Sequence, residues 1–162
     1  EQSWFRQGMQ ISRSVEFGVQ DVCNSELETD ETSLIYCGGI IESGKRSGKV
    51  IGVLGILFDW EALVYPILEG CLPRIQDSVV EGGAAFYLNS KNEIIATTDV
   101  QNFPVNNKVS LPNKNMSLET GDSASGIFEV GGKKFIIGSS KTQGYREYRG
   151  LEWTAHVVRP IN

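Results

Sequence analysis

The sequence predicts an α+β fold, with a central antiparallel sheet of five to six strands, an N-terminal helix and a short internal helix. Two observations lead to this prediction: several short runs rich in aliphatic and aromatic residues are separated by turn signals, and few segments have helical spacing. Because short turns join most of the runs, neighbouring strands are expected to pair antiparallel. The 162 residues suffice for one domain with a substantial core.

The first elements in order are a helix and two strands. Residues 1–10 are expected to be the last turns of a helix, with Trp4 and Phe5 on its apolar side. Residues 14–22 mix glycine with alternating apolar residues and predict a loop followed by a strand. The run TSLIYCGGII at residues 32–41 predicts the next strand.

The run VIGVLGILF at residues 50–58 contains no charge and ends abruptly at Asp59. It is too short to span a bilayer, which takes about 20 apolar residues. A third strand is expected here, paired back on the second through a glycine-containing turn at residues 42–48. Asp59 is a favoured helix N-cap, because its carboxylate accepts a hydrogen bond from an amide of the first turn.

Helical spacing follows over residues 60–70. Leu63, Ile67 and Leu68 are expected to form the apolar face of this helix. Pro66 conflicts with a regular helix, since its ring removes a hydrogen bond and clashes with the preceding turn, so a kink or a shortened helix is expected.

The second half of the chain is expected to consist mostly of strands. The segment AAFYLNSKNEIIATTD predicts a hairpin around residues 89–92, and residues 100–121 predict a long, irregular surface excursion. In GIFEVGGKKFIIGSS, Gly131 and Gly132 predict a primed two-residue hairpin turn. A loop at residues 144–150 then leads into a last strand at residues 151–158.

Composition and motifs argue against several functions. The net charge of -5 disfavours a nucleic-acid partner, which needs clustered Lys and Arg. The chain has one histidine, His156, and three cysteines without a CxxC pair, so no metal is expected. Nucleotide-loop and hydrolase motifs are missing, so the sequence predicts no cofactor and no enzyme activity.

The cysteines leave two interpretations open. Cys23 and Cys37 flank the polar stretch NSELETDETS, which predicts a hairpin connection. They either face each other across this hairpin and form a disulfide, or all three cysteines, Cys71 included, are small buried thiols.

Four segments, in this order, resemble the Cache domain, the PAS-like sensor module of bacterial chemoreceptors and other transmembrane signalling proteins. SWFRQG is similar to the end of its N-terminal helix, and KVIGVLGILFDWEAL to a strand that runs into a helix. FYLNSKNEIIATTD is similar to its hairpin, and YREYRGLEWTAHVV to its closing loop and strand. The resemblance covers nearly the whole chain. It implies a small-molecule pocket on one sheet face, an extracytoplasmic (periplasmic) location and a membrane-spanning parent protein.

Two departures from the amino-acid-binding Cache domains bear on the ligand. Those domains carry an Arg two places before the Trp, where this chain has Gln2. They also carry an Asp in the third strand, where this chain has Leu57. A buried ammonium or carboxylate without a partner costs several kcal/mol, so an uncharged or carboxylate metabolite is expected rather than an amino acid.

The candidate ligand-binding residues combine this resemblance with local chemistry. Trp4 and Phe5 are expected either to form a wall of the ligand pocket or to anchor the core at the base of the helix. Arg13, next to the hydroxyl of Ser14, is suited to clamp a carboxylate. Tyr36 precedes glycines that often mark a close approach by a ligand. The expected ligand-binding residues are therefore Trp4, Phe5, Arg13, Ser14, Asp21, Tyr36 and Tyr145.

The sequence thus predicts a ligand-sensing Cache domain of a chemotaxis or related receptor, residues 1–162, excised from a longer inner-membrane protein. A small molecule is the expected partner, a homodimer is one expected arrangement, and contact with a membrane is expected only through flanking segments. Two alternatives stay open: a ligand-free PAS-like module for dimerisation or relay, and a sensor that carries haem or a chromophore on His156 or a cysteine. A cytoplasmic location is the alternative to the periplasm.

Overall fold

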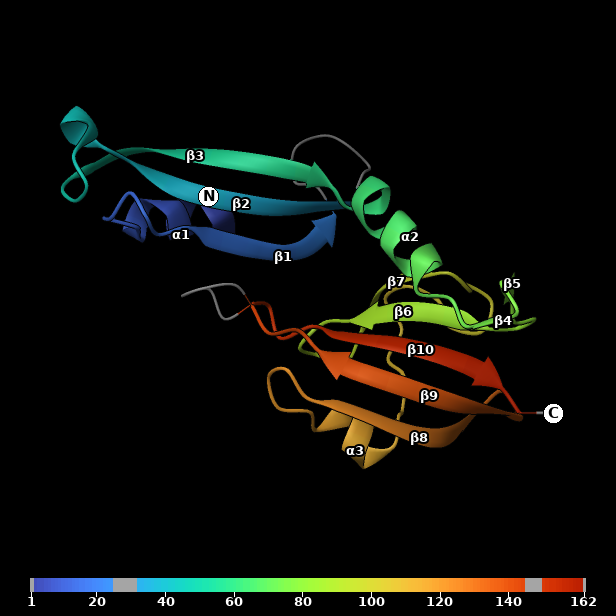
Figure 1. Ribbon diagram of the computed structural model, residues 1–162. Helices are drawn as coiled ribbons and strands as arrows, with labels where there is room; N and C mark the ends of the chain where they lie inside the picture. The colour runs from blue at the N-terminus through green and yellow to red at the C-terminus, as the bar shows by residue number, and fades with distance from the viewer. Residues whose placement is uncertain (1, 25–31, 145–149, 162) are drawn as a thin grey trace. The chain divides into compact units, whose positions relative to one another are not determined.

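The computed structural model describes residues 2–24, 32–144 and 150–161, which form two compact units. The N-terminal unit covers residues 1–63 and the C-terminal unit residues 64–162, with the division inside helix α2. The elements are α1 (Ser3–Gln10), β1 (Gly18–Asn24), β2 (Thr32–Ile41), β3 (Val50–Asp59), α2 (Trp60–Gly70), β4 (Arg74–Ile75), β5 (Ser78–Val79), β6 (Ala84–Leu88), β7 (Ile94–Thr97), α3 (Asn113–Met116), β8 (Ser123–Val130), β9 (Lys133–Lys141) and β10 (Thr154–Pro160). Figure 1 shows their course.

The N-terminal unit is a three-stranded antiparallel sheet in the order β1-β2-β3, with α1 against one face (Figure 1). The register places Tyr36 opposite Ile56 and Gly38 opposite Leu54. A short 3-10 turn joins β2 to β3, and Ser43 and its neighbour adopt left-handed backbone angles there. The predicted strands and the turn between them are confirmed.

Helix α2 begins where the sequence predicts it. The Asp59 carboxylate accepts a hydrogen bond from the amide of Ala62 at 3.1 Å, so the predicted N-cap is confirmed. The helix runs through Pro66 to Gly70 and is not shortened. The predicted apolar face is wrong in part. Its buried residues are Trp60, Val64 and Leu68, spaced by four, whereas Leu63 and Ile67 are exposed.

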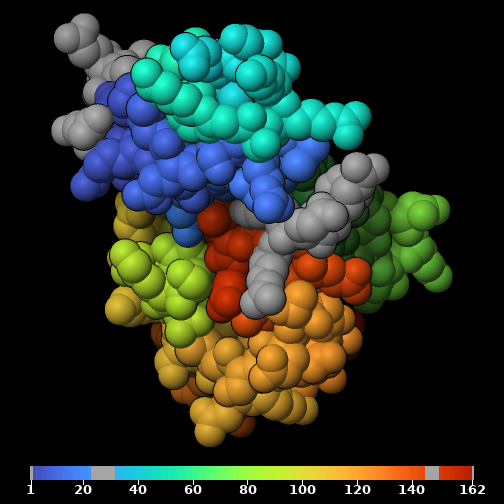
Figure 2. All heavy atoms as spheres, turned by 90° about the vertical axis from the view of Figure 1, so that its left-hand side faces the viewer, coloured from blue at the N-terminus to red at the C-terminus, as the bar shows by residue number. Residues whose placement is uncertain are grey.

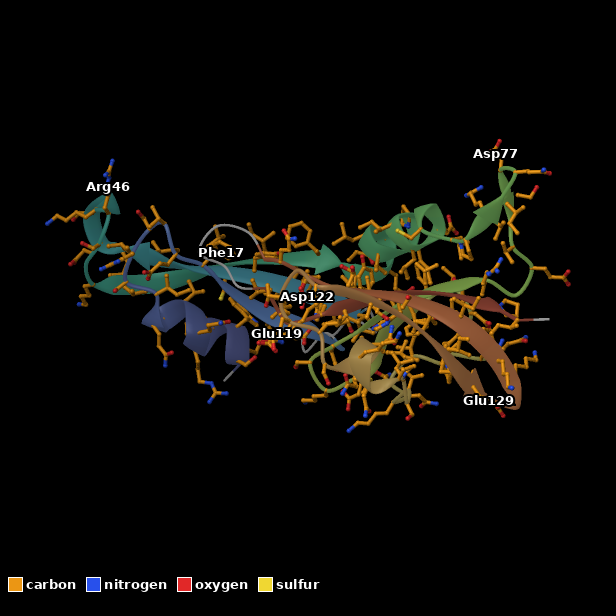
Figure 3. The ribbon with its side chains drawn as sticks, turned by 60° about the horizontal axis from the view of Figure 1, so that its bottom comes forward. Phe17, Arg46, Asp77, Glu119, Asp122 and Glu129 are labelled. Carbon is orange, nitrogen blue, oxygen red and sulfur yellow. The ribbon has the colours of Figure 1, made fainter. Side chains whose placement is uncertain are left out.

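The C-terminal unit contains a five-stranded antiparallel sheet in the order β7-β6-β10-β9-β8. Both predicted hairpins are present, and Gly131 and Gly132 at the β8–β9 turn have φ angles of 57° and 74°, as a primed turn requires. Strands β8 and β9 form the orange surface in Figure 2. Figure 3 labels Glu129, which lies at the tip of their hairpin.

One face of this sheet carries an aromatic core. Phe103 stacks on Phe86 with 4.8 Å between ring centroids, and it also contacts Phe128 and Phe135. Phe103 comes from the irregular segment at 100–121, so the prediction that this segment is only a surface excursion is wrong. Phe103 and other apolar residues of this otherwise polar segment are buried because they pack on the apolar face of the sheet and remove it from water.

The α+β prediction and the five-stranded antiparallel sheet are confirmed. The structure adds a separate three-stranded sheet before it and a two-stranded β4–β5 ribbon. That the two units act together as one sensory domain stays a prediction.

Candidate functional site

The side of the N-terminal sheet that carries α1, called the α1 face, is closely packed. A side chain at Gly39 would overlap the backbone carbonyl oxygen of Ile11, and one at Gly55 would come within 2.7 Å of the Trp4 ring. Glycine at these two positions therefore lets the helix rest directly on the strands.

Trp4 is fixed on the α1 face by polar contacts within the chain. Its indole nitrogen donates a hydrogen bond to the side chain of Gln2 at 2.7 Å, and its backbone amide donates one to Gln20 at 2.9 Å. The hydroxyl of Ser3 also bonds to Gln20. Phe5 meets the indole edge-on, with 5.9 Å between ring centroids. The indole N–H is thus already occupied by the protein itself.

The opposite side of the same sheet holds a hollow of about 400 Å³, called the groove. Successive side chains of a strand point to opposite faces, so Tyr36 projects away from α1 while Cys37 projects towards it. The Tyr36 ring lies 5.9 Å from that of Phe17 and 5.4 Å from that of Phe58. Figure 3 labels Phe17 at the groove. The groove is lined by Ser14, Glu16, Phe17, Tyr36, Cys37, Gly38, Leu54, Ile56 and Phe58.

The groove is mainly apolar, with a few polar groups at one side. Ser14 and Tyr36 contribute hydroxyls, and Glu16 is the only charged side chain among its described lining residues. Arg13 lies beside this lining, exposed, with its guanidinium 3.8 Å from the Glu16 carboxylate. The loop that carries Arg13 and Ser14 is held in place by a hydrogen bond of 3.0 Å, which the Ser14 amide donates to the carbonyl oxygen of Arg46. Apart from the adjacent residues, no atom lies within 4 Å of a Cβ atom placed at Gly38, so the floor of the groove is open there.

The structure brings only some of the predicted site residues together. Ser14 and Tyr36 line the groove, with Arg13 next to it. Trp4 and Phe5 lie on the other face of the sheet. The predicted set therefore divides between two faces.

Asp21 is not among the described residues that line the groove. Asp21 lies in β1, where its carboxylate accepts a hydrogen bond from the amide of Val22 at 2.8 Å. Tyr145 lies outside the described residues. The sequence reasoning missed the apolar wall of Phe17, Leu54 and Phe58. Because side chains alternate between the two faces along β3, the sequence could have placed Leu54 and Phe58 on one face. The wall also depends on the register between β2 and β3, which the sequence does not show.

The disulfide interpretation of the cysteines is wrong. Cys37 is a free, buried thiol, and its partner across the β1–β2 ladder is Gly18. Cys23 stands opposite Ser33 instead, four residues away along the ladder. Burial raises the pKa of the Cys37 thiol, which keeps it protonated and unreactive. The alternative, a small buried thiol, is confirmed for Cys37 but wrong for Cys71, which is exposed.

The lone histidine lies in the aromatic core of the C-terminal unit. Its Nδ1 bonds to the Ser139 hydroxyl and its Nε2 to the Thr154 hydroxyl, both at 2.8 Å, and its ring stacks on Phe86. The Asn115 amide donates to Ser139 at 2.8 Å. Burial lowers the pKa of His156 to about 4. The ring is therefore neutral at pH 7, and both of its nitrogens are engaged, so neither is available to bind a haem iron.

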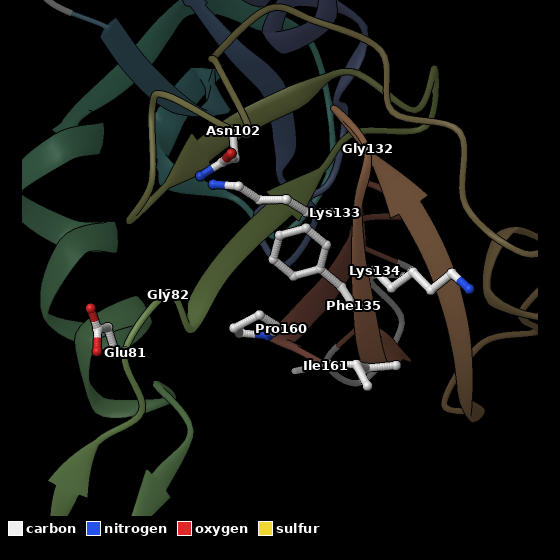
Figure 4. Close-up of a pocket in the computed structure, with 9 residues that line it drawn as sticks. All are labelled: Glu81, Gly82, Asn102, Gly132, Lys133, Lys134, Phe135, Pro160 and Ile161. Carbon is white, nitrogen blue, oxygen red and sulfur yellow. The ribbon is translucent and has the colours of Figure 1, made fainter.

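Two other hollows lie in the C-terminal unit. One, of about 710 Å³, is bounded by the exposed charged side chains of Glu81, Lys133 and Lys134 around Phe135 (Figure 4). The other, of about 300 Å³, lies on the sheet face opposite the aromatic core, where Gly138 leaves open space. The first hollow is rimmed by exposed charged side chains. The second, at about 300 Å³, lies at the lower limit of about 300–1,000 Å³ for small-molecule pockets, so the groove is the better candidate for a ligand.

The described ranges contain no cluster of three or more His, Cys, Asp or Glu side chains suited to hold a metal ion. Among the helices formed by those ranges, none is long and apolar enough to cross a membrane.

Comparison with known proteins identifies the fold. Profiles of known protein families and a sequence search of characterised proteins give no match. The solved structures give several. The GABA-bound ligand-binding domain of the Pseudomonas aeruginosa chemoreceptor PctC matches 97% of this chain with a TM-score of 0.65 and 16% identity. The isoleucine-bound domain of Pseudomonas fluorescens CtaA matches 98% with a TM-score of 0.61 and 14% identity. The periplasmic sensory domain of Campylobacter jejuni Tlp1 matches 99% with a TM-score of 0.60 and 15% identity.

These matches confirm the predicted PAS-like (Cache) fold. The chain spans 60%, 57% and 55% of the lengths of those three solved domains.

Proposed function

We propose that this chain is the ligand-binding part of an extracytoplasmic sensory domain, which detects a small molecule for a bacterial signalling protein such as a chemotaxis receptor. The observation that carries the proposal is the structural likeness to the GABA-bound domain of PctC over 97% of the chain. Only the class of function is taken from that protein. The ligand is argued from this chain's own residues.

The groove is the proposed ligand site. Its volume of about 400 Å³ lies in the range of about 300–1,000 Å³ that small-molecule pockets occupy. The apolar walls of Phe17 and Phe58 supply the surface to be buried, and the hydroxyls of Ser14 and Tyr36 supply directed hydrogen bonds. Such a site binds a small molecule with an apolar part and one or two polar groups.

The charges around the groove bear on the ligand's own charge. Glu16 lines the groove, and the guanidinium of Arg13 lies towards Glu16. An uncharged or cationic ligand meets no repulsion from this carboxylate, whereas an anion does. We therefore infer an uncharged molecule or an amine. A carboxylate ligand, which the sequence favoured because of Arg13, stays a prediction and belongs in the same test.

Sensing needs more than binding. A ligand shifts a conformational equilibrium only by the difference between its affinities for the two states. The loop with Ser14 on one side of the groove and strand β3 on the other are the parts that a ligand would draw together. The proposed signal is a change in their separation.

A thermal-melt screen against amines, alcohols, sugars and organic acids tests the proposal. A ligand at 100 times its Kd stabilises the folded protein by about 2.7 kcal/mol. Gly38→Leu fills the open floor of the groove and should abolish the shift. Gly138→Leu is the matched control, because it places the same side chain in open space in a strand of the other unit. It should keep the shift.

Three results would count against the proposal. A flat response across the whole panel contradicts small-molecule sensing. Binding that survives Gly38→Leu but is lost in Leu57→Asn places the ligand on the α1 face instead. A visible absorbance band in the purified protein indicates a haem or chromophore sensor.

A ligand-free dimerisation or relay module is the second candidate. It is favoured by the exposure of apolar side chains on β3, where Leu54, Ile56 and Phe58 are 59%, 49% and 40% exposed. This candidate predicts a dimer in sedimentation experiments without ligand, together with no melting shift.

A further inference from the structure

A continuous line of buried polar side chains crosses the core of the C-terminal unit. Asn115 in α3 donates a hydrogen bond of 2.8 Å to the hydroxyl oxygen of Ser139 in β9. That hydroxyl bonds at 2.8 Å to Nδ1 of His156, and Nε2 of the same ring bonds at 2.8 Å to the hydroxyl of Thr154. Asn115 and His156 are each only 1% exposed. The line therefore connects α3, β9 and β10 inside the unit.

The hydrogen atoms of this line can be assigned from its donors and acceptors. The NH2 group of Asn115 can only donate, so the Ser139 oxygen accepts from it. Within the described ranges, the other hydrogen-bonding partner of this hydroxyl is Nδ1 of His156, so the hydroxyl hydrogen points to Nδ1. The neutral ring then carries its hydrogen on Nε2, which donates to Thr154. A proton added at Nδ1 would place two hydrogens between His156 and Ser139.

Asn115 also has an acceptor that this arrangement does not use. Its Oδ1 is buried and has no hydrogen-bond partner in the part of the chain that the structure describes. This oxygen faces β8, because a Cβ atom placed at Gly126 would lie 2.7 Å from it. The amide nitrogen also donates to the carbonyl oxygen of Ala124 at 3.3 Å and so ties α3 to β8 (Figure 1). Since buried polar groups are nearly always paired, the unpaired oxygen favours a second arrangement in which it is used.

We propose that Asn115, Ser139 and His156 form an acid-responsive switch that releases α3 from β8 when the imidazole takes up a proton from solvent. The new hydrogen on Nδ1 is donated to the Ser139 oxygen. The hydroxyl hydrogen of Ser139 turns to Asn115, whose side-chain amide rotates by half a turn and presents Oδ1 as the acceptor. After this rotation, Oδ1 also faces the carbonyl oxygen of Ala124. The bond that ties α3 to β8 is thereby replaced by repulsion between two oxygens.

The elements around His156 are α3, β6, β8, β9 and β10, and burial lowers the pKa of its ring to about 4. On β9, Lys141 lies on the same face of the sheet, with its ammonium 3.5 Å from the Glu152 carboxylate. Tyr87 of β6 lines the hollow on the opposite face, together with Cys71. The other titratable side chains of these five elements are exposed; they are Lys114, Glu129, Lys133, Lys134 and Arg159. The switch should therefore respond to acid rather than to changes near neutral pH.

An NMR titration of the 162-residue protein from about pH 7 to about pH 3.5 tests this proposal. Ring 15N shifts report the tautomer and the protonation of His156, and the side-chain NH2 signals of Asn115 report the rotation of its amide. The backbone amides of Met116 and Ser117, which bond to carbonyls at the start of α3, report release of the helix by hydrogen exchange. We expect the hydrogen on Nε2 at neutral pH. As the ring is protonated, the protection factors of the two α3 amides should fall at least about tenfold, whereas those of β9 should not change.

Two variants form a matched pair, because each removes one hydroxyl that lies 2.8 Å from the same imidazole. Ser139→Ala interrupts the line to Asn115, so α3 should keep its protection when the ring is protonated. Thr154→Val removes the bond on the other side of the ring and leaves the line to Asn115 intact. Acid release of α3 should therefore persist in Thr154→Val.

Several results would overturn the proposal. In the original protein these are a neutral ring with its hydrogen on Nδ1, a ring that stays neutral throughout the titration, or α3 amides that keep their protection when the ring is protonated. Loss of protection in α3 and β9 together would show unfolding of the whole unit instead of a local release. Equal release of α3 in Ser139→Ala, or its loss in Thr154→Val, would show that the signal does not pass through Ser139. All of these readouts lie in the C-terminal unit and use no ligand, so failure of the ligand screen leaves them unchanged.

Discussion

The neighbouring glycines of β2 offer a sharp test of the packing in the N-terminal unit. Gly38 and Gly39 point to opposite faces of one sheet. A methyl group at Gly39 would overlap the carbonyl oxygen of Ile11 and lie 3.1 Å from that of Gly8. Since both obstacles are backbone atoms, α1 must move away from the sheet. Overpacking of this kind costs about 1–3 kcal/mol.

The same methyl group at Gly38 meets no atom within 4 Å. Glycine within a strand is less stable than alanine by about 0.5–1 kcal/mol, so Gly38→Ala should stabilise the unit by that amount. Two adjacent substitutions with identical chemistry are thus expected to differ by about 1.5–4 kcal/mol in the free energy of unfolding, with opposite signs.

The chain has two units, so each unit needs its own value of the free energy of unfolding. For the N-terminal unit this value is best measured from the amide exchange of β2. Amides of β9 in the C-terminal unit serve as the reference and should not change in either variant. Equal effects of the two substitutions on β2, or a Gly39→Ala variant as stable as the original protein, would refute the close packing of α1.

Three other predictions concern the C-terminal unit and α2. Burial lowers the pKa of His156 from 6.5 to about 4, so the unfolded chain binds a proton between these pH values that the folded chain does not. The stability of the C-terminal unit should fall as pH drops below 6.5, by about 2 kcal/mol at pH 5 relative to pH 7.5. A pH profile of unfolding that is unchanged in His156→Gln would contradict this. Phe103→Ala, which empties a buried site against Phe86, should cost about 3–5 kcal/mol in urea unfolding; a loss below 1 kcal/mol would indicate that the segment does not belong to the core. Asp59→Ala removes the cap on the Ala62 amide and should cost about 0.5–2 kcal/mol, whereas Asp59→Asn should retain most of it; equal losses would show that the cap is not the cause.

Local patterns in the sequence were sufficient for most elements. The strand at Thr32–Ile41 and the helix at Trp60–Gly70 have the predicted bounds. Asp59 caps the helix, and Gly131 and Gly132 form the predicted turn. Each of these features depends on chemistry within a few residues, such as a carboxylate near an amide or a positive φ angle that glycine accepts without strain.

The candidate site was only partly predictable. Tyr36 and Ser14 were expected near a ligand and do line the groove, but Trp4 was expected with them and lies across the sheet. A shift of one residue in register moves a side chain to the other face. The face of each residue therefore depends on strand pairing, which the sequence pattern does not specify.

The sequence by itself determined the α+β class and most of the longer helices and strands, because repeating apolar patterns and turn residues act locally, and four motifs in order indicated the sensor fold. It did not predict the short elements α3, β4 and β5. Only the tertiary structure decided that the strands divide between two units, and that Phe103 from an irregular segment packs into the aromatic core. It also decided that, among the strands of the described ranges, β3 pairs along one edge only. These features depend on contacts between residues far apart in the chain, which form wherever apolar surface is best removed from water.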